Sequence, residues 1–302
     1  LAASDRMGEV NAVIMSQRSI DRALGNANTM ASMGPGQDMN SRLKQFREVY
    51  CDVNDNNRGL AFICDHDQTN LSGSNVGGSD PARFNKDIDY MNTVELPWSL
   101  GVNFTDGSSG ASPDEEDVFA MAANLYGSQV FRRPVTGLDD NGANLNSLQE
   151  AYMDARAVLA KRGVAENSYN AIVGMKSAGT AGSRDFLQAI LTELGMDDAA
   201  ANVKTPNGTL SAVDYMLGNN PSYHAQMEVL TKKIYQNPDF YTNLYDTPAN
   251  VARKEVALQA IGLMQKFDLL KSNLRNEMNQ SILLELAVED LQTKIENEPL
   301  KR

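Results

Sequence analysis

The sequence predicts a mostly α-helical protein: a multi-helix domain with an irregular disulfide-bearing lobe and a long C-terminal helix. Apolar residues recur every three or four positions in several segments, which is the spacing of amphipathic helices. No stretch shows a run of alternating strands or a βαβ rhythm. After Pro248 the chain has no further proline before position 299 and only one glycine, Gly262. We therefore divide the 302 residues into N-terminal helices (1–50), the lobe (51–112), a helical domain (113–247) and the long helix (248–302).

Two helices are expected before the lobe. The first covers residues 5–25, where apolar side chains recur at helical spacing and Gly25 can end the helix. A break of the sequence SMGPGQD follows. The second helix covers residues 37–49 and leads the chain to Cys51.

The segment YCDVNDNNRGLAFICDHD, residues 50–67, contains both cysteines of the chain and many Asp and Asn residues. Aligned as an EF-hand loop that begins at Asp52, it places Asn54 and Asn56 at ligand positions. The loop would need Gly where Asn57 stands and Glu where Ile63 stands. An EF-hand is therefore disfavoured, and an Asx-rich turn is the preferred interpretation.

The two cysteines are predicted to form a disulfide bond. A zinc site is disfavoured, because Cys51, Cys64 and His66 supply only three ligands. A redox motif is also disfavoured, because it places its two cysteines close together, whereas twelve residues separate these two. A pair that leaves no cysteine over suits an exported protein. Two reduced cysteines in a cytosolic protein are the alternative. A looser calcium site also stays open, with ligands from Asp52, Asn54 and Asp55.

A helix start is well marked at Ser112, since Pro113 suits the first helical position and Glu115 completes a capping box. The acidic run 114–117 is typical of a first helical turn, where the helix dipole favours carboxylates, and we prefer this to a metal or acid–base cluster. Further helices are expected over 144–161, closed by Gly163, and in the short segments ENSYNAIVGM, SRDFLQAILTELG and TLSAVDYML, with Pro221 opening another to about residue 236.

The region from Pro248 to residue 297 is predicted to form one long helix. At 1.5 Å per residue such a helix spans roughly 70 Å, which exceeds an ordinary globular helix. Coiled-coil-like packing, against a second copy or a partner, is therefore expected. A kink at Gly262 that folds the helix back on itself is the compact alternative. The apolar residues at steps of three and four are Val251, Leu258, Ile261, Phe267, Leu274, Met278, Ile282, Leu286 and Ile295.

Charge and hydropathy exclude several partners. The net charge of −12 argues against general nucleic-acid binding and against electrostatic docking on anionic lipid. No apolar run approaches the roughly 20 residues of a membrane span, so we expect no transmembrane segment in this chain. The start LAASDRM lacks the pattern of a secretory signal, and we expect a processed form that works in the periplasm or outside the cell.

We expect no enzyme activity, no cofactor and no metal. The sequence has no G-x-S-x-G elbow, P-loop or H-E-x-x-H motif, and its two histidines, His66 and His224, lie far apart. Aromatic residues gather instead in the segment KKIYQNPDFYTNLYDTPANV, and such side chains favour interfaces or pack a helical elbow. The partner-binding residues that we predict are Tyr235, Phe240, Tyr241, Tyr245, Phe267, Leu274, Met278 and Ile282.

The segment from Val229 to Leu286, which begins VLTKKIYQNPDFYTNLYDTPANV, resembles the C-terminal region of the IcmX/TraW family of type IVB secretion systems. The Cys-bracketed segment YCDVNDNNRGLAFIC is similar to a segment of the same family. The resemblance covers the two ends of the chain and rests on no catalytic signature. It implies a non-enzymatic periplasmic component of the Dot/Icm-like or conjugative apparatus, next to an inner-membrane protein of the DotA/TraY type and assembled as an oligomer.

Two other classes of function stay open from the sequence. An exported pilus-tip or adhesin-like helical protein would bind a recipient surface. A secreted hydrolase would use a pair of the 39 acidic residues on a cell-wall glycan.

Overall fold

The computed structural model describes residues 1–25, 34–60, 62–64, 81–96, 98–106, 111–126, 130, 147–193, 202–205, 208–211, 220–233, 235, 238–242 and 244–297. This part of the chain is mostly helical, as predicted. Its helices and strands are α1 (Ala2–Ala23), α2 (Pro35–Gln45) with a π-helical turn (Phe46–Tyr50), α3 (Asp55–Arg58), a 3-10 turn (Pro81–Arg83), a π-helical turn (Met91–Glu95), α4 (Pro113–Leu125), α5 (Ser147–Lys176), α6 (Ser183–Glu193), β1 (Asn202–Thr205), β2 (Gly208–Ser211), α8 (Tyr223–Glu228) with a π-helical turn (Val229–Lys233), α9 (Pro238–Thr242) and α10 (Pro248–Asn297).

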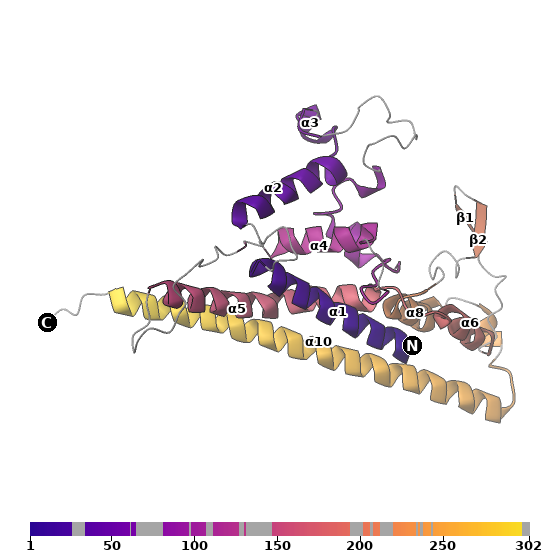
Figure 1. Cartoon of the computed structure of the whole chain (residues 1–302). Coiled ribbons are helices and arrows are strands. Elements are labelled where there is room, and N and C mark those ends of the chain that lie inside the picture. The colour runs from indigo at the N-terminus through magenta and orange to yellow at the C-terminus, as the bar shows by residue number, and fades with distance from the viewer. Residues whose placement is uncertain are drawn as a thin grey trace.

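The helices form layers around α5, which runs through the middle of the molecule. Helix α1 crosses α5, and α10 lies along the length of α5 at the lower edge of the view (Figure 1). Helix α4 covers another side of α5, and α2 lies beyond α4 (Figure 1). The strands β1 and β2 form a small antiparallel pair away from this stack, with Val203 opposite Leu210.

Helices α1 and α5 approach unusually closely because two glycines face each other at the crossing. A Cβ atom added to Gly174 would lie 2.4 Å from the carbonyl oxygen of Gly8, and one added to Gly8 would lie 2.4 Å from the carbonyl oxygen of Gly174. No real Cβ contact is that short, and the obstructing atoms belong to the backbone. The sequence at these two positions therefore sets the distance between the two helices.

Gly174→Ala is expected to destabilise the protein by about 2 kcal/mol, because the methyl group forces the two helices apart. Gly163→Ala is the matched control in the same helix, since its Cβ would meet nothing within 4 Å. That change is expected to stabilise by about 0.8 kcal/mol through helix propensity. Chemical denaturation of both variants measures the difference, and equal stabilities would contradict the tight crossing.

The central core joins segments that are distant in the sequence. Met15 of α1 and Val173 of α5 are buried together with Val94 and Val102 of the lobe and with Met121 of α4. The hydroxyl of Tyr169 donates to the backbone carbonyl of Val118 at 2.8 Å, which ties α5 to α4 through the same core. The N-terminal helix, the lobe and the helical domain therefore share one core.

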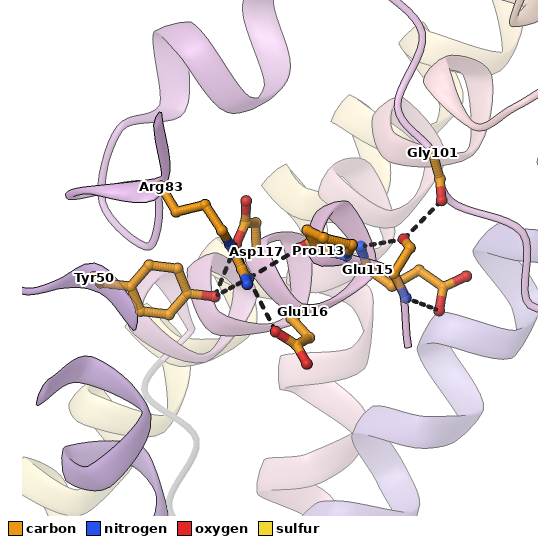
Figure 2. A network of polar contacts seen from close by, with 8 residues as sticks. Tyr50, Arg83, Gly101, Pro113, Glu115, Glu116 and Asp117 are labelled. Atoms are coloured by element: carbon orange, nitrogen blue, oxygen red, sulfur yellow. Dashed lines mark hydrogen bonds and ion pairs between the residues drawn. The ribbon is translucent and has the colours of Figure 1, made fainter. Parts of the chain in front are cut away.

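The lobe is held to α4 by a buried polar network (Figure 2). Arg83 forms an ion pair with Asp117 at 2.5 Å, and the hydroxyl of Tyr50 donates to the same Asp117 oxygen at 3.0 Å. Arg83 also contacts Glu116 at 3.0 Å. Burial, followed by the nearby Asp117 carboxylate, raises the pKa of Tyr50, so the hydroxyl keeps the proton that it donates.

The capping box at the start of α4 is confirmed. The side chain of Ser112 accepts from the backbone N–H of Glu115 at 3.1 Å, and the Glu115 carboxylate accepts from the N–H of Ser112 at 3.3 Å. Glu115 also accepts from the backbone N–H of Asn103 at 2.9 Å, and Asp114 accepts from the N–H of Gly101 at 2.6 Å. The acidic first turn therefore binds backbone donors of the lobe in addition to suiting the helix dipole.

The end of α5 holds the other side of the lobe. Lys176, its last residue, is 1% exposed and donates its ammonium protons to the backbone carbonyls of Val94 and Leu96. Burial lowers the pKa of Lys176 to about 8. The backbone N–H of Leu100 donates to the carbonyl of Lys176 at 2.8 Å. This lysine therefore acts as a structural clamp between α5 and the lobe.

The predicted disulfide between Cys51 and Cys64 is present, with the two Cα atoms 5.5 Å apart. Cys51 is fully buried, and both cysteines pack with Val53, Phe46 and Leu60 in a small cluster of their own. The bond therefore closes the beginning of the lobe directly after α2. Residues 65–80, which include Asp65, His66 and Asp67, lie outside the described residues.

Several predicted element boundaries are wrong. Helix α5 continues through Gly163 to Lys176, because a single glycine costs only about 1 kcal/mol and packing against α1 and α10 outweighs it. The segment TLSAVDYML, expected as a helix, begins in strand β2 at Thr209, and its continuation from 212 lies outside the described residues. The prediction of one long helix from Pro248 to 297 is confirmed, since α10 is one helix of 50 residues, and the compact alternative, a kink at Gly262, is absent.

Candidate partner-binding surface on α10

The side of α10 that faces away from the body carries a regular row of exposed positions. We call this row the outer seam. Its spacing alternates between four and three residues, which is the pattern of the a and d positions of a coiled coil. Every member is exposed, and all but Glu277 and Ser281 are apolar. The members are Val256, Ala260, Leu263, Phe267, Leu270, Leu274, Glu277, Ser281, Leu284 and Val288.

The outer seam exposes large side chains along most of the helix. Leu263 and Leu284 are 66% and 67% exposed, and Leu270 and Leu274 are 51% and 54% exposed. At 3.6 residues per turn the seam positions repeat every seven residues on one side of the helix. A helix of this length spans about 75 Å. Large exposed apolar patches on a protein surface mark interaction sites.

The opposite side of α10 packs on the body through apolar residues near its start and through polar contacts farther along. Leu258 and Ile261 reach the core cluster near the start of the helix. Farther along, Asp268 accepts from the Tyr223 hydroxyl at 2.6 Å. Three more contacts join α10 to α1 and α5: Lys271 with Glu9 at 2.8 Å, Asn279 with Ser168 at 3.1 Å, and Glu289 with Lys161 at 2.5 Å.

A cavity of about 310 Å³ lies between α1, α5 and α10. Its walls carry both signs of charge, with Asp5 and Asp268 near Lys271 and Arg275. Burial raises the pKa of Asp5. Helix α10 is therefore attached along its middle by polar groups around a cavity rather than by a packed apolar face.

The distribution of apolar residues on α10 differs from that in an ordinary surface helix. Such a helix turns its apolar stripe to the core and its polar face to water. Here the docked side has polar contacts along its middle, and the water side carries the apolar heptad row. Burying apolar surface is favourable by roughly 25 cal/mol per Å².

The outcome for the predicted α10 residues is mixed. Phe267 and Leu274 belong to the outer seam, and Met278 is 50% exposed at its edge. Ile282 is half-buried and lies three residues after Asn279, on the docked side of the helix. Five large apolar residues of the seam were not among the predicted residues, although the alternating four-and-three spacing marks them in the sequence: Val256, Leu263, Leu270, Leu284 and Val288.

The aromatic segment before α10 divides between core and surface. Phe240 is 5% exposed and packs in the cluster with Leu258 and Ile261, so the structure gives it a core position rather than a partner-binding one. Tyr235 and Tyr241 stack edge-on against Phe240, with ring centroids 5.3 and 5.4 Å away.

The remaining rings of this elbow face water. The Tyr241 hydroxyl donates to the backbone carbonyl of Tyr235 at 3.1 Å, which fixes the two exposed rings relative to each other. Tyr245 is 95% exposed. Tyr235, Tyr241 and Tyr245 therefore stay available for contact beside the start of α10.

The residues considered for calcium are engaged in local hydrogen bonds. Asp52 accepts from the backbone N–H of Asn54 at 2.9 Å, and Asp55 accepts from the side chain of Asn85 at 2.8 Å. Asn57 adopts a left-handed φ of 54°, as expected for an Asx-rich turn. Within the described ranges, no three His, Cys, Asp or Glu side chains are grouped to hold a metal ion.

His224 is half-buried at the start of α8. Its Nδ1 atom is buried and has no hydrogen-bond partner among the described residues. Burial, followed by the charge of Lys176, lowers the pKa of His224, so the ring is neutral at physiological pH.

Fold and surface together define a mostly helical, disulfide-bonded protein with an exposed apolar row at heptad spacing on α10. In the part of the chain that the structure describes, none of the helices combines the length and the apolar character needed to cross a membrane. Comparisons with family models, with curated proteins and with solved structures find no match.

Proposed function

We propose that this protein is a non-enzymatic structural component of a type IVB secretion or conjugation apparatus in the periplasm. Its assembly surface is the outer seam of α10. Through this surface it packs with a DotA/TraY-like inner-membrane protein and with further copies of itself in an oligomeric translocation channel. The observation that carries the proposal is the uncovered apolar heptad row on the outward side of α10, a helix that polar contacts attach to the body along its middle.

Two further observations support the proposal. The disulfide between Cys51 and Cys64 is typical of proteins in oxidising compartments such as the periplasm. The resemblance to the IcmX/TraW family covers the Cys-bracketed segment and the region from Val229 into α10, which includes the aromatic elbow and much of the seam.

A substitution of one seam leucine tests the proposal, and the chain supplies a matched control. Leu270→Gln removes an apolar seam position, and Leu269→Gln changes its neighbour, which is 61% exposed and lies off the seam. We expect wild type and Leu269→Gln to form the same assemblies, alone or with the detergent-solubilised membrane partner. Leu270→Gln is expected to weaken them about tenfold or more, since each buried leucine contributes roughly 1.5–3 kcal/mol.

Light scattering coupled to size-exclusion chromatography measures the assemblies over a wide concentration range. If all three proteins stay monomeric, both alone and with the membrane partner, the proposed function is wrong. Exposure of the protein on the surface of intact cells would favour the adhesin-like alternative instead.

A further inference from the structure

We infer that the outer seam of α10 is covered by α10 of a second copy of this chain, in an antiparallel coiled coil centred between Arg275 and Asn276. The inference rests on the proposed function, because it takes the outer seam to be an assembly surface. It adds the identity and the direction of the helix that covers the seam. The argument comes from the order of residues along the seam and from the distribution of charge along α10.

The seam positions from 263 to 288 are spaced symmetrically about the centre of the proposed coiled coil. An antiparallel partner places an a position opposite a d position, so each seam residue needs a counterpart at the mirrored distance from the centre. Here Leu263 lies opposite Val288 of the second copy, Phe267 opposite Leu284, Leu270 opposite Ser281, and Leu274 opposite Glu277. Neither polar seam residue then meets another polar seam residue directly. Each packs against a leucine.

The parallel arrangement places like charges together. It would put Glu277 against Glu277 of the second copy inside the seam, because identical positions meet in a parallel pair. This contact is repulsive, and the Glu277 pair would be partly desolvated.

The two halves of α10 carry opposite net charge. Residues 248–275 contain five basic and two acidic side chains, and residues 276–297 contain one basic and five acidic side chains. An antiparallel pair sets the basic half of each helix beside the acidic half of the other, whereas a parallel pair sets like halves together. Complementary charge of this kind selects partner and orientation.

The surroundings of the seam leave room for this partner. The docked side of α10 faces α5 and α1, and no other described element lies on the opposite side (Figure 1). A second copy related by a two-fold axis uses the same surface on both chains, which is the commonest geometry of homodimers.

Disulfide trapping between two single-substitution variants tests both identity and direction. Phe267→Cys and Leu284→Cys are prepared separately in the full chain with tags of different mass, mixed to allow exchange and then mildly oxidised. In the antiparallel register these two positions face each other only across a mixed pair. We expect a covalent dimer of mixed mass in the mixture and none in either variant alone, with peptide mapping that joins positions 267 and 284. Leu269→Cys, mixed with either variant, is the off-seam control.

Any other outcome contradicts the inference. Some of these outcomes also contradict the proposed function, and others do not. Covalent dimers of Phe267→Cys alone would show parallel pairing. The absence of any cross-link, while Leu270→Gln still loses the membrane partner, would show that the seam binds that partner and not a second copy. The absence of a cross-link together with monomers under every condition would remove both proposals. Circular dichroism of each variant checks that the helices are retained.

Discussion

Arg83→Met is expected to destabilise the protein by about 3–5 kcal/mol, because it leaves the buried carboxylate of Asp117 without its ion-pair partner. The Asp117 side chain is 5% exposed, and the Arg83 guanidinium holds it with two nitrogens, at 2.5 and 3.1 Å. The same guanidinium also satisfies Glu116 and the backbone carbonyl of Pro113. The free energy of unfolding from denaturant titration measures the loss.

Two controls separate the buried charge from ordinary effects of losing an arginine. Lys44→Met breaks a well-exposed ion pair with Glu48 and is expected to cost less than about 0.5 kcal/mol. The double change Arg83→Met with Asp117→Asn removes the unpaired charge and is expected to recover much of the loss. If Arg83→Met were as mild as Lys44→Met, the network would not hold the lobe to α4.

Loss of the Cys51–Cys64 bond is expected to destabilise the protein by about 3 kcal/mol, the value of the chain-entropy model for a loop of this size. The cysteines are 13 positions apart and buried in their own small cluster with Val53 and Phe46. The double variant Cys51→Ala with Cys64→Ala and reduction of the wild type should shift the denaturation midpoint by similar amounts.

The double variant Cys51→Ala with Cys64→Ala also serves as the control for the effect of the reducing agent. The chain has two cysteines in all, so a reducing agent must leave the stability of the double variant unchanged. An unchanged midpoint on reduction of the wild type would contradict the stabilising role of the bond. Free thiols at both positions in protein taken from its native compartment would contradict the proposed periplasmic location.

Local signals in the sequence predicted local structure well. Ser112, Pro113 and Glu115 marked the start of α4, and the capping box formed as expected, because its partners lie within one helical turn. Gly25, with a φ of 66°, follows the end of α1. The Cys51–Cys64 pairing was also predictable, since a chain with two cysteines has only one possible intramolecular disulfide.

Predictions that depended on which side of a helix meets the core were less successful. The apolar residues of α10 were taken as one set, but the structure divides them between two sides: Leu258 and Ile261 pack inward, and Phe267 and Leu274 face water. Both sides repeat at helical spacing, so periodicity alone cannot tell them apart. Which side of α10 packs on the body depends on the residues of α1 and α5 that lie against it.

The sequence by itself determined the helical class, the disulfide, the caps and the length of α10, because these depend on residues close together in the chain. Only the tertiary structure decided that Phe240 is a core residue, that Arg83 and Tyr50 meet at Asp117, and that Gly8 and Gly174 set a helix crossing. It also turned the apolar heptad row of α10 to water. These outcomes depend on contacts between residues many positions apart, which are decided by packing and by the pairing of buried polar groups.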